Sequence, residues 1–271
     1  SLCYRQLNQP SLASQALERD QLYQSAALAE ARNPFRLATP PRVELLANTR
    51  PGNKWALLVG INQFQSPGAR PLNFAVADAR QVALTLAHPR IGRFPAQQIT
   101  TLTDAQATTF QIKSALNRIS RLARPDDIVF VFFSSHGTAR DMDHRQANYI
   151  VTHDTDLSSP DSLFGSALPM VEVSEIIRTR CAAQRTVILL DTCHSGGALQ
   201  LAGRPVPPCV VSAREVDRFR EGSGRFVLTA SQADERSYER AGHGYFTRAF
   251  LEVLTESQGC TPLTRLFARV Q

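Results

Sequence analysis

Two short apolar runs, each ending in reactive side chains, constrain the fold of this chain more than any other feature. Residues 186–190 are apolar or β-branched throughout, and residues 128–133 form a second run of the same kind. Runs of this length without polar alternation predict strands covered on both faces, as in the parallel sheets of α/β proteins. In such sheets ligands bind beyond the carboxyl ends of the strands. We therefore expect a site where these two runs end.

The residues that follow the two runs suggest a nucleophile and a base. Cys193 follows the first run, His136 follows the second, and glycines stand at positions 137, 196 and 197. A cysteine thiol has a pKa of ~8.5, so attack at neutral pH needs an imidazole to take its proton. The backbone N–H groups of Gly137 and Cys193 are suited to an oxyanion hole. Either side chain alone is more often structural, and only their conjunction favours catalysis.

Other chemistries for these residues fit the sequence less well. His194 competes with His136 as the base, but neighbouring side chains at a strand end point to opposite sides, which favours His136. A phosphatase loop would need arginine six residues after the cysteine, where Leu199 stands. The five cysteines include no CxxC pair, so neither a zinc ribbon nor thioredoxin chemistry is predicted.

The chain divides in composition near residue 53. Residues 1–53 are rich in glutamine, alanine and arginine, and we expect them to form an N-terminal extension or prodomain. A helix over residues 11–31 would alternatively pack on the following domain. Residues 54–271 are long enough for one domain with its own core. Because the chain starts at Ser1 and stops inside an expected helix, we expect it to be part of a longer protein.

The pattern after residue 53 alternates strands with helices, which predicts a parallel sheet covered by helices. Residues 198–224 interrupt this pattern with prolines, arginines and no clear period, and they predict a long loop. A hairpin is expected around residues 149–151. The expected strands are 55–61, 98–102, 128–133, 186–190 and 225–230, and the expected helices are 73–88, 108–122, 170–180, 246–255 and 262–270.

Charge and hydropathy exclude some classes of function. The formal net charge of +6 comes almost wholly from arginine, and the arginines are scattered, so nucleic-acid binding is not predicted. No apolar run approaches the ~20 residues that a membrane-spanning helix needs. Neither a membrane segment nor a signal peptide is therefore expected.

The motifs at the two strand ends resemble those of the caspase-like cysteine peptidases, specifically the metacaspase and bacterial orthocaspase branch of peptidase family C14. The matching residues are Ser134-Ser-His-Gly137 and Asp191-Thr-Cys-His-Ser-Gly196, and the likeness extends to Gly244-Tyr-Phe-Thr247. The resemblance implies an α/β, caspase-like three-layer sandwich, with a mostly parallel sheet of about six strands and helices on both faces. It also implies three regions: a large-subunit region at 54–197, a processing loop at 198–224 and a truncated small-subunit region at 225–271.

The resemblance implies a cysteine endopeptidase in which Cys193 is the nucleophile, His136 the acid and base, and Gly137 with Cys193 the oxyanion donors. It assigns Asp78, Ser134 and Asp191 to the substrate-binding pocket. Two carboxylates in one narrow pocket would select arginine or lysine before the scissile bond. From the sequence alone, Asp78 is equally well a helix-surface acid and Asp191 a turn-capping one. The rival functions are an inactive caspase-fold interaction module and a scaffold that binds a basic peptide without turnover.

The resemblance carries further expectations about processing, metal and partners. Relatives process themselves at basic sites after the cysteine, and many need calcium, for which Asp154 and Asp156 are candidates here. Residues 198–210 contain no acid, which argues against the family's calcium ligands in that segment. We expect protein or peptide substrates, no nucleic-acid partner, and a soluble bacterial protein of the cytoplasm or periplasm. The candidate processing sites are Arg204, Arg214, Arg218, Arg220 and Arg225.

Overall fold

The computed structural model describes most of the chain after residue 51. The expected extension over residues 1–53, with its helix over 11–31, lies outside the described part except for its last two residues, and the helix expected over 262–270 also lies outside it. The described residues are 52–139, 142, 147–192, 199–207, 209, 211, 216–217, 224–229, 239–240 and 243–256.

A parallel sheet forms the centre of the fold. Its strand order is β2-β1-β3-β6-β9, and every neighbouring pair is parallel. The described part of the sheet has five strands, where about six were expected, and all five coincide with strands predicted from the sequence. The strands are β1 (Lys54–Gly60), β2 (Ile99–Thr103), β3 (Ile128–Ser134), β6 (Arg185–Asp191) and β9 (Arg225–Thr229).

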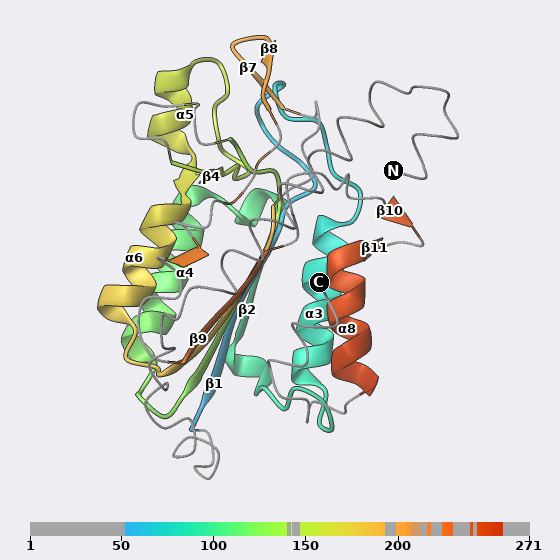
Figure 1. Ribbon diagram of the computed structural model, residues 1–271, viewed down its shortest axis with the longest axis vertical. Coiled ribbons are helices and arrows are strands. Elements are labelled where there is room, and N and C mark those ends of the chain that lie inside the picture. The colour runs from blue at the N-terminus through green and yellow to red at the C-terminus, as the bar shows by residue number, and fades with distance from the viewer. Residues whose placement is uncertain are drawn as a thin grey trace, which may run out of the picture. The chain divides into compact units, whose positions relative to one another are not determined.

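Helices cover both faces of the sheet, as the predicted sandwich requires. Figure 1 shows α4 and α6 on one face and α3 and α8 on the other. Alternate strand residues pack on opposite faces, because successive side chains of a strand point to opposite sides. Val131 and Phe133 of β3 join the core beneath α4 and α6, while Phe130 and Phe132 join the core beneath α3 and α8. The helices are α3 (Ala75–Ala87), α4 (Thr109–Leu122), α6 (Met170–Arg180) and α8 (Tyr245–Glu256).

Short elements surround the carboxyl ends of the strands. Tyr149 and Ile150, which were expected in a hairpin, form β4, and Ile150 also bridges to Gly137. β4 pairs antiparallel with β5, but α5 lies between them in the sequence, so the pair is not a hairpin. Part of the region predicted as one long loop is instead an ordered hairpin of β7 and β8, where Leu199, Leu201 and Val206 are buried. These elements are η3 (Asp104–Gln106), β4 (Tyr149–Ile150), α5 (Pro160–Ser166), β5 (Leu168–Pro169), β7 (Gln200–Leu201), β8 (Arg204–Pro205), β10 (Glu239–Arg240) and β11 (His243–Gly244). A further short helix, η2 (Ala96–Gln98), precedes β2 at its amino end.

Asp127 links the amino ends of β1 and β3 through hydrogen bonds. Its carboxylate accepts hydrogen bonds from the backbone nitrogens of Asn53, at 2.7 Å, and Arg124, at 2.9 Å, and from the indole nitrogen of Trp55, at 3.0 Å. The side chain is buried, so all three donors depend on it for a partner. The start of β1 and the turn before β3 are thereby held in one arrangement.

We expect Asp127→Ala to lower the free energy of unfolding by about 1–3 kcal/mol, because it leaves three partly buried donors without their acceptor. Trp55 is the only tryptophan of the chain, so its fluorescence in a urea titration reports the transition. Asp126→Ala is the matched control, since that neighbouring side chain is exposed. Equal unfolding midpoints for the two variants would contradict this role of Asp127.

Candidate active site

The two strands that lead to the candidate catalytic residues are neighbours in the sheet. β3 and β6 pair in parallel along seven residues, and Ser134 at the end of β3 lies opposite Asp191 at the end of β6. His136 follows β3 by two residues, and Cys193 follows β6 by two. The expected adjacency of the two strand ends is therefore confirmed. Cys193 itself, with His194, Gly196 and Gly197, lies outside the described residues.

The imidazole of His136 is buried and held by a backbone carbonyl. Its Nε2 lies 2.7 Å from the carbonyl oxygen of Arg70, and its ring stacks against Phe64 with 5.0 Å between the ring centroids. A carbonyl can only accept, so Nε2 must donate its proton in this hydrogen bond. In the neutral ring the lone pair then belongs to Nδ1. In this tautomer Nδ1 is the ring atom that can accept a proton.

The segment that carries His136 is fixed by β4. The carbonyl of His136 accepts from the backbone nitrogen of Val151 at 2.9 Å, and Thr138 donates to the carbonyl of Tyr149 at 3.0 Å. The hydroxyl of Ser135 adds a hydrogen bond to the carbonyl of Val151 at 2.6 Å. The strand end is thus continued as an extended segment, which limits the freedom of the histidine.

Gly137 lies where two other segments come close. A Cβ at this position would lie 2.7 Å from the carbonyl oxygen of Thr192 and 2.7 Å from Sγ of Cys209. Real Cβ atoms almost never come within 3.0 Å of another heavy atom, so only glycine fits without a shift. Because Thr192 directly precedes Cys193 in the chain, Gly137 is packed against the segment that leads to the candidate nucleophile.

Both acids of the predicted pocket are buried beside the first turn of α8. Asp78 and Asp191 are each 1% exposed. Oδ2 of Asp78 accepts from the backbone nitrogen of Gly244 at 3.2 Å, and Oδ2 of Asp191 accepts from the hydroxyl of Thr247 at 3.0 Å. The alternative role of Asp78 as a helix-surface acid is therefore wrong. Ser134, the third predicted pocket residue, is also buried and lies opposite Asp191 in the register.

Both calcium candidates accept hydrogen bonds from neighbouring groups of the protein. Oδ1 of Asp154 accepts from the backbone nitrogen of Thr109 at 2.9 Å and from the hydroxyl of Thr152 at 2.8 Å. Asp156 accepts from the backbone nitrogen of Ser158, and this hydrogen bond is the main reason that the pKa of its carboxyl is lowered. Within the described ranges, no three metal-ligating side chains gather in one place.

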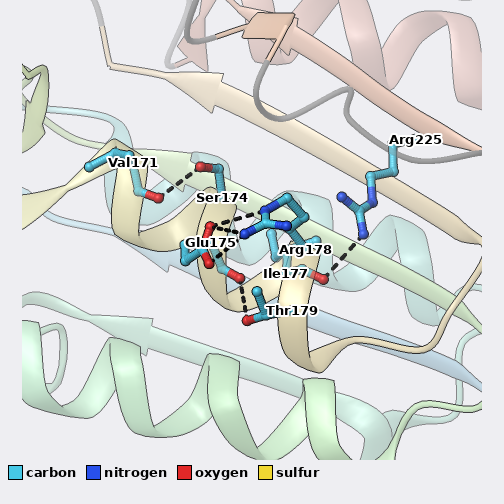
Figure 2. Close-up of polar contacts among 7 residues, drawn as sticks. All are labelled: Val171, Ser174, Glu175, Ile177, Arg178, Thr179 and Arg225. Atoms are coloured by element: carbon cyan, nitrogen blue, oxygen red, sulfur yellow. Dashed lines mark hydrogen bonds and ion pairs between the residues drawn. The ribbon is translucent and has the colours of Figure 1, made fainter.

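Two of the five candidate processing arginines are held in sheet structure. Arg204 pairs with Leu201 in the β7 and β8 hairpin, and Arg225 pairs with Thr186 at the start of β9. Figure 2 shows the guanidinium of Arg225 donating to the carbonyl of Ile177 in α6, at 3.3 Å. The other three candidates, Arg214, Arg218 and Arg220, lie outside the described residues.

Sequence reasoning missed several residues of this site. Arg70 contributes a backbone oxygen, for which no side-chain pattern exists, and Cys209 is one of several scattered cysteines. Gly244 and Thr247 stand in a stretch whose only signal in the sequence is the family likeness. Their contacts with the two acids span 166 and 56 positions of the chain, so only the folded structure brings them together.

A parallel α/β sandwich with a histidine and a cysteine motif at adjacent strand ends defines a class of cysteine peptidases. A family model described as the caspase domain, of peptidase family C14, matches residues 53–271. The chain belongs to this caspase-domain family.

Relatives with assigned names are metacaspases. The chain is 28% identical over 159 residues to Metacaspase-1 of Ajellomyces capsulatus, which covers 55% of this chain and 42% of that protein. It is 26% identical over 175 residues to Metacaspase-1 of Schizosaccharomyces pombe, which covers 62% of this chain and 40% of the relative. These matches span less than half of the relatives' length. Both organisms are fungi. The expectation of a bacterial protein of the cytoplasm or periplasm therefore stays a prediction.

A solved structure with the same fold is protein GSU0716 from Geobacter sulfurreducens. The two structures superpose with a TM-score of 0.56 at 20% identity, and the match covers 81% of this chain and 88% of that chain. At this identity the likeness supports the fold alone. As for the membrane, none of the helices in the described ranges combines the length and the hydrophobicity that a span requires.

We expect Gly137→Ala to destabilise the protein by about 1–3 kcal/mol, because its Cβ overpacks against Thr192 and Cys209. The matched control is Gly165→Ala in α5, where a Cβ would meet nothing within 4 Å. Thermal unfolding of both variants and the parent measures the difference. A loss of stability for Gly165→Ala as large as that for Gly137→Ala would refute the steric argument.

Proposed function

We propose that the chain is a cysteine endopeptidase of metacaspase type that cleaves peptide bonds after arginine or lysine. The observation that carries the proposal is the parallel register of β3 and β6, with Ser134 opposite Asp191. This register brings together the strand ends that lead to His136 and Cys193. The family membership and the tautomer of His136 support the same assignment.

The proposed reaction follows from the chemistry of these groups. Nδ1 of His136 takes the proton of the Cys193 thiol, and the thiolate attacks the carbonyl carbon of the scissile bond. The backbone N–H groups of Gly137 and Cys193 stabilise the negative oxygen of the tetrahedral intermediate. The intermediate then expels the amine, which leaves with the proton from His136, and a thioester remains. Water hydrolyses the thioester, with His136 accepting the proton of the attacking water.

The proposed preference for basic residues rests on two buried carboxylates. Asp78 and Asp191 both receive hydrogen bonds from the beginning of α8, and both are supported by neutral donors. A pocket that gathers two carboxylates stabilises the guanidinium of arginine or the ammonium of lysine through charge-assisted hydrogen bonds. An aspartate side chain in the same pocket would be repelled.

We expect the parent protein to hydrolyse fluorogenic peptides that end in arginine or lysine, and not those that end in aspartate. Cys193→Ala should abolish the turnover. Parallel assays with calcium and with a chelator determine whether calcium is needed, as in the family expectation. Hydrolysis that persists in Cys193→Ala, or a preference for aspartate, would contradict the proposal.

In the same assay, Asp191→Asn should lower kcat/KM for the arginine peptide by about 10- to 100-fold, because one charge-assisted hydrogen bond is lost. A small thiol reagent such as iodoacetamide provides the control, since alkylation of Cys193 does not use the pocket. Burial raises the pKa of the buried Cys181 thiol, so Cys181 should alkylate slowly and leave Cys193 distinguishable by mass spectrometry.

We also propose that self-processing occurs at Arg214, Arg218 or Arg220. Proteolysis needs a chain segment that can leave its hydrogen-bonded structure, and the backbones at Arg204 and Arg225 are paired in sheets. We expect fragments of the parent to begin after one of the three arginines, as read by intact-mass analysis, and no fragments from Cys193→Ala. Cleavage after Arg225 would show that sheet pairing does not protect this site.

A further inference from the structure

The amino end of α8 donates hydrogen bonds to both acids of the proposed pocket. Gly244, directly before the helix, donates its backbone N–H to Asp78, and Thr247 in the first turn donates its hydroxyl to Asp191. The acids come from different elements, because Asp78 lies in α3 and Asp191 ends β6. All three side chains, those of Asp78, Asp191 and Thr247, are buried. One helix end therefore joins two parts of the site.

Buried carboxylates need such donors in order to stay charged. Burial favours the neutral form of an acid, and a second carboxylate nearby favours it further. Hydrogen bonds to the ionised form act in the opposite direction, and the amino end of a helix adds a favourable partial positive charge. The donors at α8 are neutral, so they stabilise the carboxylates without cancelling their charge. The negative charge stays available for a basic ligand.

We propose that Thr247 is a positioning residue of the specificity pocket, which keeps Asp191 ionised and in one orientation for a basic substrate side chain. This inference rests on the proposed function. The buried hydroxyl of Thr247 donates to Asp191, so we assign it a role that acts through this carboxylate. The pocket would then be completed by a residue from beyond the 198–224 region, whereas the other pocket residues precede it.

The test compares Thr247→Val, which removes the donor at nearly constant volume, with Thr247→Ser, which keeps it. Thr255→Val is the matched control on the same helix, because the hydroxyl of Thr255 is exposed and donates only to the carbonyl of Leu251. We expect Thr247→Val to lower kcat/KM for the arginine peptide about tenfold, mostly through KM. Thr247→Ser and Thr255→Val should stay close to the parent, and iodoacetamide should alkylate Cys193 equally fast in all variants.

The pH profile separates this role from a structural one. Loss of the hydroxyl donor raises the pKa of Asp191, because the charged form loses a hydrogen bond. The acid limb of kcat/KM should therefore move to higher pH in Thr247→Val and return in Thr247→Ser. The ionisable side chains of Asp78 and His136 are the same in both variants, so the difference between the variants isolates Asp191. An unchanged acid limb and KM in a folded Thr247→Val would overturn the proposal.

The affinity for a peptide that ends in arginine tests the role of Thr247 without any need for turnover. Calorimetric titration of an acetylated peptide ending in arginine into Cys193→Ala, with and without Thr247→Val, should show about tenfold weaker binding for the double variant. Absence of hydrolysis by the parent would count against the proposed peptidase alone. Equal affinities, or no binding by either protein, would overturn the role of Thr247. Trp55 fluorescence confirms folding, and Thr247→Ala replaces Thr247→Val if the latter unfolds.

Discussion

The parallel pairing of β3 with β6 is the constraint on which the rest of the structure depends. β3 lies between β1 and β6, and its side chains are buried on both faces, so it cannot slide without disrupting the packing of both cores. A shift of one residue would exchange every side chain between the two cores. The packing of Val131 and Phe133 against one helix layer, and of Phe130 and Phe132 against the other, therefore determines which residues meet at the strand ends.

The site built on these strand ends is supported mainly by backbone groups and neutral hydroxyls. The carbonyl of Arg70 orients His136, the N–H of Gly244 reaches Asp78, and the hydroxyl of Thr247 reaches Asp191. Backbone groups belong to segments that are themselves packed, so they can hold a side chain with less loss of conformational freedom than a long charged side chain would suffer. These three groups orient the side chains of His136, Asp78 and Asp191, and none of the three carries a formal charge.

The sequence predicted the sheet well because β1, β3 and β6 are apolar runs with clear ends, and because β2 and β9 are short segments that alternate with helical patterns. It also predicted that His136 and the Cys193 motif follow neighbouring strands, since both runs stop at reactive residues. It did not predict the β7 and β8 hairpin, because that segment's few apolar residues, such as Leu199 and Leu201, stand among glycine, proline and arginine. Nor could it predict Thr247 or the Arg70 carbonyl, since long-range contacts and backbone acceptors leave no local pattern.

Cleavage in the proposed processing region, residues 198–224, would not by itself detach the elements that follow it. β9 and α8 follow that region in sequence, yet β9 pairs with β6 over five residues and Phe250 of α8 packs on Phe130 with 5.9 Å between the ring centroids. A cut between residues 211 and 224 would leave these contacts intact, because none of them passes through the cleaved segment. Both fragments would stay joined through sheet hydrogen bonds and the apolar core beneath α3 and α8. Cleavage there would therefore not separate Thr247 from Asp191.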